Sequence, residues 1–239
     1  MPDSDPFLAA ASLEGVPSAV AAARDGIDAL LRDRGLRRTT PEDTARSLLL
    51  GAAATSRLEG GESDPEVLAG GGGDATARAA VRLSTELLGL VPVWQRAPVQ
   101  AVARLHALAA GGSVPDDDLG RPTDPAGVAR LADLGRRLVA GTDAPGLVVA
   151  ALVHAEIVDA AAFVSHNGVV ARAAERLVLV ARGVDPASVT VPEAGHAAEP
   201  EGYRGALAAY GRGDTAGVAQ WLNYAAAAFT RGAEASPIG

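Results

Sequence analysis

Apolar residues recur along this chain at the spacing of one helix face, in blocks that are separated by proline and glycine. The alternation of apolar and polar residues that marks a strand never persists beyond a few positions. Only 3% of the residues are aromatic and alanine is abundant, so the core has to be built from Ala, Leu and Val. The pattern predicts an all-α fold with closely packed helices and argues against a βαβ fold.

Nine helices are expected, and proline, capping residues or glycine mark most of their ends. Their approximate ranges are 18–34, 41–58, 75–90, 98–111, 125–139, 145–163, 168–182, 200–210 and 215–230. Between them, 61–74 is predicted to be a loop or a short helix with a glycine tail, 111–124 a polar loop, and 183–199 a Pro/Gly-rich connection. No clean linker interrupts the chain, so we expect one domain over 1–239.

Composition limits the functions that are open to the chain. The absence of cysteine excludes disulfides, thiol nucleophiles and Cys-based zinc sites. The net charge of -8, with no basic stripe, argues against a nucleic-acid partner. The most apolar run, 145–158, is about 14 residues long and too short to span a bilayer, and the acidic N-terminus lacks a signal-peptide pattern. We therefore expect a cytoplasmic protein without membrane insertion.

Common cofactor and metal motifs are missing. The glycines at 70–73 follow no strand and lack dinucleotide-loop spacing, and there is no Walker A sequence. The four histidines, His106, His154, His166 and His196, have no metal-binding spacing, and Glu156 is two residues from His154, on a different helix side. The serines lack a nucleophile-elbow context. We expect no metal site and no cofactor.

The stretch 154–183, HAEIVDAAAFVSHNGVVARAAERLVLVARG, is typical of a helix, a tight turn and a second helix. An Asn167–Gly168 pair at a helix start leaves backbone N–H groups free to attract an anion, and glycine allows close approach. Arg172 lies one turn further and can reach the same space. On its own, turn chemistry explains the pair fully.

The same stretch resembles the signature H-x-F-x-D/E-G-N-G-R-x-x-R of the Fic/Doc (Fic-domain) family. Phe163, Asn167, Gly168 and Arg172 match in register. The departures fall on the catalytic machinery of that family. The catalytic histidine position is Ala161, the acidic metal-binding position is Ser165, the first glycine is His166 and the first arginine is Val169.

A second resemblance lies upstream. Fic proteins often carry an inhibitory motif, S/T-x-x-x-E-G/N, and residues 55–60 read TSRLEG, with Thr55, Glu59 and Gly60 at its three defined positions. The resemblance implies that Glu59 pairs with Arg172 and plugs the remnant nucleotide site. Residues 105–112 resemble the helix before the family's flap, which would correspond to 113–124, where Gly120–Pro122 match only loosely.

The resemblance covers about residues 40–185 and implies a Fic-like helical bundle with an N-terminal inhibitory-type helix and a C-terminal helical extension, about 200–232. It also implies that catalysis is lost. Alanine at 161 cannot act as a general base, and serine at 165 replaces an anionic metal ligand poorly. His166 is a weak candidate for a relocated base, and a role in capping the turn is favoured over it.

The leading interpretation is a pseudoenzyme without AMP-transferase activity that acts as a regulatory or protein-interaction module, with an unidentified protein partner or a second copy of itself. The alternative is a repurposed enzyme that binds a nucleotide-like or small anionic ligand through Asn167, Gly168 and Arg172. His166, Glu59 or His154 would then supply acid–base chemistry. The aromatic residues of the C-terminal helices, Tyr203, Tyr210, Trp221 and Tyr224, are expected to pack.

Overall fold

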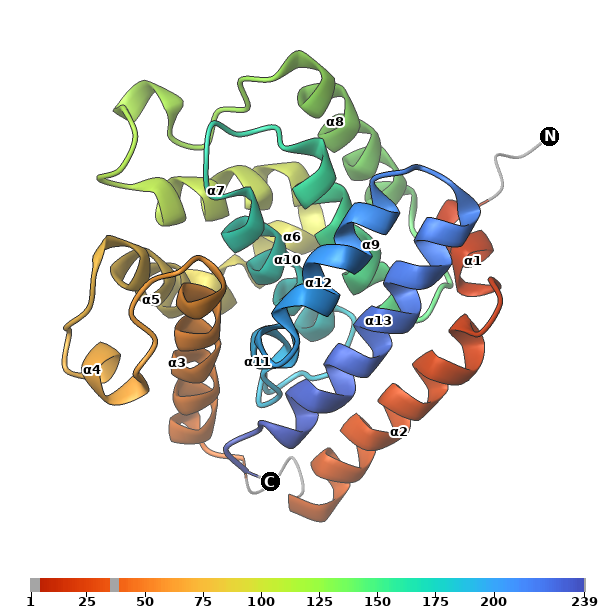
Figure 1. The fold of residues 1–239 in the computed structure, drawn as a ribbon, viewed down its shortest axis with the longest axis horizontal. Coiled ribbons are helices and arrows are strands. Elements are labelled where there is room, and N and C mark those ends of the chain that lie inside the picture. The colour runs from red at the N-terminus through yellow and green to blue at the C-terminus, as the bar shows by residue number, and fades with distance from the viewer. Residues whose placement is uncertain (1–4, 35–38, 239) are drawn as a thin grey trace.

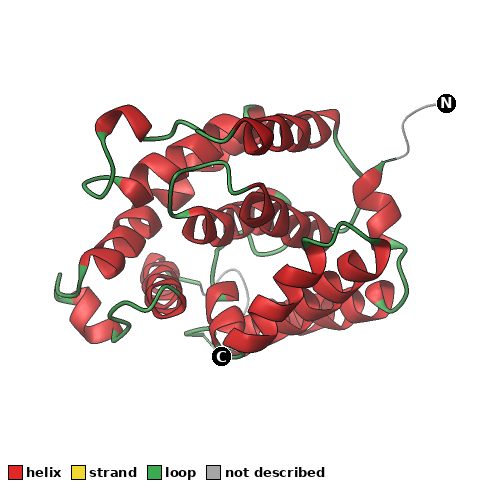
Figure 2. Ribbon diagram, turned by 45° about the horizontal axis from the view of Figure 1, so that its top comes forward, coloured by secondary structure: helices red, strands yellow, loops and turns green. Residues whose placement is uncertain are grey.

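The computed structural model describes residues 5–34 and 39–238, and within them all regular structure is helical (Figure 2). The longer helices are α2 (Val16–Arg34), α3 (Pro41–Leu58), α5 (Ala75–Leu87), α7 (Pro98–Ala110), α8 (Pro125–Ala140), α9 (Gly146–Ala160), α10 (Asn167–Ala181), α12 (Pro200–Tyr210) and α13 (Thr215–Glu234). The shorter ones are α1 (Pro6–Ala11), α4 (Pro65–Ala69), α6 (Val91–Arg96) and α11 (Pro192–Ala197), with 3-10 turns η1 (Leu88–Leu90) and η2 (Asp116–Asp118). The all-α prediction is confirmed.

The nine predicted helices are present, with ends shifted by a few residues. The helix predicted over 145–163 ends at Ala160, because Ala161 adopts a left-handed conformation with φ of 43°. The prediction of an irregular connection over 183–199 was wrong in part, since this segment contains α11. Helices α1, α6 and α11 were missed because six residues are too few to show helical periodicity.

Helix starts follow the local sequence. At α3, Thr40 accepts from the backbone N–H of Asp43, and the Asp43 carboxylate accepts from the backbone N–H of Thr40, so both ends of a capping box form around Pro41. Asp124 and Asp214 cap α8 and α13 through the side chain alone, each accepting from the backbone N–H three residues on. These caps fix where the long helices enter the bundle.

Helices α9 and α10 form the centre of the fold, joined by a turn over residues 161–166 and packed along each other (Figure 1). Helix α9 is apolar on nearly all sides, and a helix of that kind has to be surrounded by protein. Neighbours supply this cover: α7 packs on α10, α8 packs on α9, and α13 packs on α9. Of the helices described, none combines the length and apolar character needed to cross a membrane.

The chain ends join the same core. Helices α2 and α13 lie side by side at one edge of the bundle (Figure 1), and α1 packs on α9. A single hydrophobic cluster includes Val16 of α2, Leu83 of α5, Leu177 of α10 and Trp221 of α13. A smaller cluster joins α3, α4 and α5. The C-terminal helices therefore pack into the body of the fold.

Helix α11 is held by a buried arginine and by close backbone packing. The guanidinium of Arg176 donates to both carboxylate oxygens of Glu193 at 2.8 and 2.5 Å, and to the carbonyl oxygen of Thr190 at 2.9 Å. Gly195 lies against α13, where an added Cβ atom would be 1.9 Å from the carbonyl oxygen of Ala228. The prolines and glycines that suggested a loop thus permit a tightly packed short helix.

We predict that Gly195→Ala destabilises the protein by about 3 kcal/mol, because the new methyl group forces α11 away from α13. Gly205→Ala is the matched control, since Gly205 is exposed on α12 and a Cβ there meets nothing within 4 Å. This control should stabilise the fold by about 0.5–1 kcal/mol through helix propensity. Urea denaturation followed by circular dichroism measures both, and equal midpoints would contradict the prediction.

Candidate functional site

The turn between α9 and α10 places the motif positions at the surface of the bundle. Ala161 is exposed at the end of α9 and presents only a methyl group. Phe163 is buried and its ring stacks on His106 of α7, with centroids 4.2 Å apart and planes 10° from parallel. The aromatic position of the motif therefore anchors the turn to α7.

Asn167 locks this turn with two hydrogen bonds to one residue. Its side-chain oxygen accepts from the backbone N–H of Phe163 at 3.1 Å, and its amide nitrogen donates to the carbonyl oxygen of Phe163 at 2.8 Å. The amide acts as a substitute backbone group, which is the common use of asparagine in turns. The side chain is thus committed to the turn.

Both the backbone and the side chain of His166 contribute to the turn. Its φ of 60° is left-handed, so it caps the start of α10 at a position that favours glycine. Its Nδ1 lies 2.7 Å from the hydroxyl of Ser165. Burial lowers the pKa of His166 below its usual value. A neutral imidazole that contacts the serine hydroxyl is the expected state near neutral pH.

Arg172 is buried at 1% exposure, and side chains from two other helices contact it. Its Nη2 donates to Glu59 Oε1 at 2.5 Å and its Nε approaches the hydroxyl of Thr55 at 3.4 Å. From α12, the Tyr203 hydroxyl accepts from Nη1 at 3.2 Å. The two side chains named by the inhibitory motif, Thr55 and Glu59, therefore both contact the second arginine of the main motif.

Glu59 also covers the start of α10. A Cβ atom at Gly168 would lie 3.1 Å from Glu59 Oε1 and 3.4 Å from Arg172 Nη1, so the glycine gives the carboxylate room to approach. A helix N-terminus attracts negative charge, and here an internal carboxylate takes that place. Gly60, with φ of 80°, ends α3 directly after Glu59 and directs the chain away.

The predicted flap segment, 113–124, lies against the turn. The backbone N–H groups of Thr123 and Asp124 both point to the carbonyl oxygen of Ala162, at 2.8 and 3.3 Å, and Gly120 N–H donates to His106 Nδ1 at 3.0 Å. Residues 113–124, all of which the structure describes, form no strand. Arg121 points outward with a largely exposed side chain.

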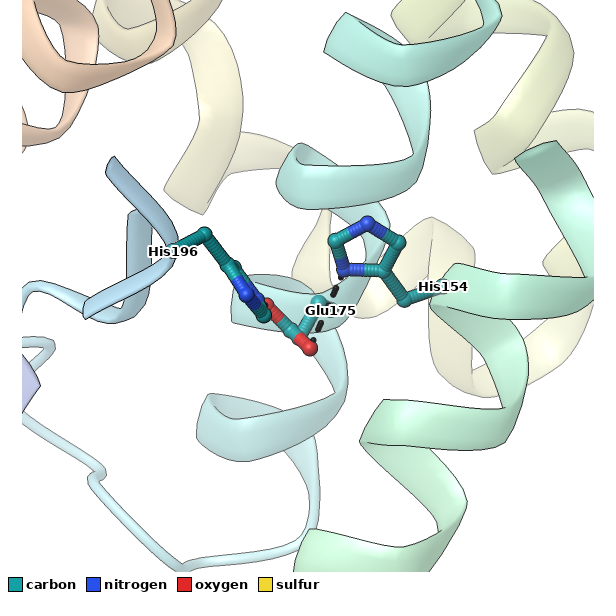
Figure 3. A group of neighbouring side chains, drawn as sticks. All are labelled: His154, Glu175 and His196. Carbon is teal, nitrogen blue, oxygen red and sulfur yellow. Dashed lines mark hydrogen bonds and ion pairs between the residues drawn. The ribbon is translucent and has the colours of Figure 1, made fainter. Parts of the chain in front are cut away.

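A second polar group, which was not predicted from the sequence, lies deep in the bundle (Figure 3). His154, Glu175 and His196 come from α9, α10 and α11 and are fully buried. Burial lowers the pKa of His154 to about 4. Burial alone would raise the pKa of Glu175, but the two adjacent histidines hold it at about 2. A fully buried His154 has no route to a ligand in the motif turn.

Three of the aromatic residues of the C-terminal helices, Tyr203, Trp221 and Tyr224, enclose this group. The rings of Tyr203 and Trp221 lie 5.6 and 5.2 Å from that of His154, and the ring of Tyr224 lies 5.8 Å from that of His196. The expected packing role of these aromatics is thus accompanied by polar contacts. Their concentration in an aromatic-poor chain was the one sequence signal that could have located the cluster.

Comparison with known proteins identifies the fold. No protein-family model matches the sequence, and no curated protein matches it either. Among solved structures, a Fic family protein from Desulfovibrio desulfuricans G20 superposes with a TM-score of 0.75 at 18% identity, over 90% of this chain and 73% of that one. Fic-1 from C. elegans superposes with a TM-score of 0.67 at 15% identity, over 91% of this chain and 72% of that one.

A variant of the same C. elegans segment gives a TM-score of 0.63 at 15% identity, covering 90% of this chain and 70% of that one. At these identities the likeness establishes the architecture. The helical bundle described here has the Fic-domain fold, as the motif resemblance predicted.

We predict that Asn167→Ala lowers the free energy of unfolding by about 1–2 kcal/mol, because both hydrogen bonds to the Phe163 backbone are lost. Ser165→Ala is the matched control from the same turn, and removal of its partly exposed hydroxyl should cost no more than about 0.5 kcal/mol. Chemical denaturation with fluorescence detection measures the difference. A loss for Ser165→Ala as large as for Asn167→Ala would refute the proposed locking role of the amide.

Proposed function

We propose that this protein is a Fic-fold pseudoenzyme that does not transfer AMP and that acts as a regulatory or protein-interaction module. The observation that carries the proposal is the carboxylate of Glu59, which is hydrogen-bonded to Arg172 and lies over Gly168 at the start of α10. An internal anion thus occupies the position where the motif resemblance expects a nucleotide phosphate.

The side chains in the turn between α9 and α10 support the proposed loss of AMP transfer. The position of the family's catalytic histidine holds Ala161, whose methyl group cannot take a proton from a hydroxyl nucleophile. Loss of a general base alone costs about two to four orders of magnitude in rate. The acidic position holds Ser165, whose hydroxyl contacts His166. A neutral hydroxyl is a weak ligand for Mg²⁺ compared with a carboxylate.

The arginine that remains is already engaged. Arg172 donates to Glu59 and to Tyr203 and approaches Thr55, so a phosphate has to displace Glu59 to reach it. Val169, at the position of the first motif arginine, is buried and offers no donor. An anion can therefore bind Arg172 only if Glu59 moves, and the Glu59 side chain is 36% exposed.

An interaction role fits the surface beside the closed site. The turn exposes the apolar side chain of Val164, which is 56% accessible. The adjacent segment 113–124 carries the acidic turn Asp116–Asp118, in which Asp116 and Asp117 are exposed. A partner segment that pairs an apolar residue with basic side chains suits this combination.

The plug can be tested by removing its carboxylate. We predict that ATP with Mg²⁺ leaves the thermal midpoint of the unmodified protein unchanged. In Glu59→Ala the same ligand should raise the midpoint by roughly 5 °C at a concentration near 100 times its Kd, since binding to the native state stabilises it. The shift should vanish in Glu59→Ala combined with Arg172→Met. Each midpoint is compared with that of the same variant without ligand.

Glu86→Ala is the matched control, because Glu86 is an exposed glutamate on α5, away from the turn. It should behave as the unmodified protein does. If Glu59→Ala shows no shift, the carboxylate is not a plug. A shift in the unmodified protein that Arg172→Met abolishes supports the alternative of a ligand-binding enzyme. Radiolabelled AMP transfer from ATP to any protein by the unmodified chain overturns the pseudoenzyme proposal.

A further inference from the structure

Three potential metal ligands from three helices meet at one point in the core (Figure 3). His154 of α9, Glu175 of α10 and His196 of α11 each offer one nitrogen or oxygen atom, and these atoms lie within 4.8 Å of one another. All three side chains are inaccessible to solvent. In Figure 3 the two imidazoles approach the Glu175 carboxylate from opposite sides.

The carboxylate of Glu175 has no arginine partner of its own. The two arginines on the same helix are occupied, because Arg172 pairs with Glu59 and Arg176 pairs with Glu193. A buried carboxylate needs a counter-charge close to it, since the free energy of burying it unpaired is large. The groups that remain beside Glu175 are two imidazoles, which are neutral unless they bind a proton or a cation.

The contact between His154 and Glu175 is close but poorly aligned, and a shared cation between the two atoms accounts for this geometry. His154 Nδ1 and Glu175 Oε1 are 3.1 Å apart, yet neither atom has a hydrogen bond of acceptable alignment. A ring N–H points along the imidazole plane, and in that direction it misses the oxygen. Misalignment of this kind is expected where both lone pairs point to a common centre. On the other side, His196 Nε2 lies 2.9 Å from Glu175 Oε2.

The outer nitrogens of both histidines face tyrosine hydroxyls. His154 Nε2 is 2.8 Å from the Tyr203 hydroxyl, and His196 Nδ1 is 3.4 Å from that of Tyr224. Histidines that bind a metal usually donate the N–H of the other nitrogen to an oxygen, which fixes the tautomer and the ring orientation. The tyrosine oxygens therefore leave His154 Nδ1 and His196 Nε2 as the inward lone pairs.

We propose that His154, Glu175 and His196 bind one divalent transition-metal ion of the Zn²⁺ class in the core of this protein. Zn²⁺ accepts a donor set of two imidazole nitrogens and one carboxylate oxygen, at bond lengths of about 2.0–2.2 Å. Donors around such an ion stand roughly 3.4 Å apart in a tetrahedral arrangement. Side-chain adjustments on the order of one ångström bring the three atoms to that spacing.

The surroundings keep bulk solvent away from the ion. The cluster is enclosed by Tyr203 and Trp221, with Tyr224 packed against His196, and none of its donor side chains reaches solvent. Binding joins α9, α10 and α11, and it adds to the ion pair between Arg176 and Glu193 and to the close packing of Gly195 on α13 that already hold α11. The donor side chains are distinct from those of the motif turn, and Tyr203 contacts both sites. Zinc content and the ATP-induced thermal shift are separate readouts, so the two proposals can fail separately.

The full-length protein, expressed with Zn²⁺ in the medium and purified by gel filtration, should contain about one zinc per chain by elemental analysis. Stripped with a chelator and reloaded with Co²⁺, it should show the visible absorption of a low-coordinate cobalt site, which a hydrogen-bonded core without metal cannot produce. The thermal midpoint should rise when Zn²⁺ is restored. Each readout is independent of any enzymatic activity.

Glu175→Gln and His196→Gln should lower Zn²⁺ affinity by at least about 100-fold, and Tyr203→Phe, which keeps the ring and removes the hydroxyl, by about 10-fold. His166→Gln is the matched control, because it removes a partly buried histidine outside the cluster, and it should retain the zinc. A zinc content near zero in the unmodified protein overturns the proposal. So does full binding by a folded Glu175→Gln variant.

Discussion

Helix α10 carries three ionisable side chains into the core within little more than one turn, and the surrounding helices are arranged to meet them. Arg172 is met by Thr55 and Glu59 of α3, and Glu175 is met by His154 of α9 and His196 of α11. Arg176 is met by Glu193 of α11. A buried charge without a partner costs several kcal/mol, so positions of α3 and α11 are constrained by α10.

The same constraint explains how the turn between α9 and α10 keeps its shape. Glu59 ends α3, where a carboxylate opposes the helix dipole. Its ion pair with Arg172 and its position over the start of α10 offset that cost, and Gly60 turns the chain away immediately. Asn167 and the Phe163–His106 stack hold the turn from the other side. The retained motif residues are therefore sufficient to explain a fixed turn, whichever ligand or partner it meets.

Much of the fold could be predicted because its determinants are local. Periodicity, prolines and caps located the nine long helices, and the spacing of Phe163, Asn167 and Arg172 located the central turn. The contact between Glu59 and Arg172 was predictable only through the resemblance, since 113 residues separate the pair. The buried cluster was not predicted, and only the concentration of aromatic residues in the C-terminal helices pointed toward it. Glu175 lies in a predicted helix with no local sign of its burial, and His196 lies in a segment whose prolines and glycines indicated a connection. Local sequence carries no information on which distant imidazole meets a buried carboxylate.

Tyr203 connects two polar regions of the molecule, the motif turn and the buried cluster of His154, Glu175 and His196. Its hydroxyl accepts from Arg172 Nη1 at 3.2 Å and lies 2.8 Å from His154 Nε2. A phenolic oxygen has two lone pairs, so it can accept from the arginine and from a protonated Nε2 together. With an ion on Nδ1 that arrangement is required, because the metal-bound imidazole carries its proton on Nε2. The hydroxyl then holds Arg172 toward Glu59 from the interior. A metal ion bound to His154 and the ion pair between Arg172 and Glu59 therefore favour the same orientation of the Tyr203 hydroxyl.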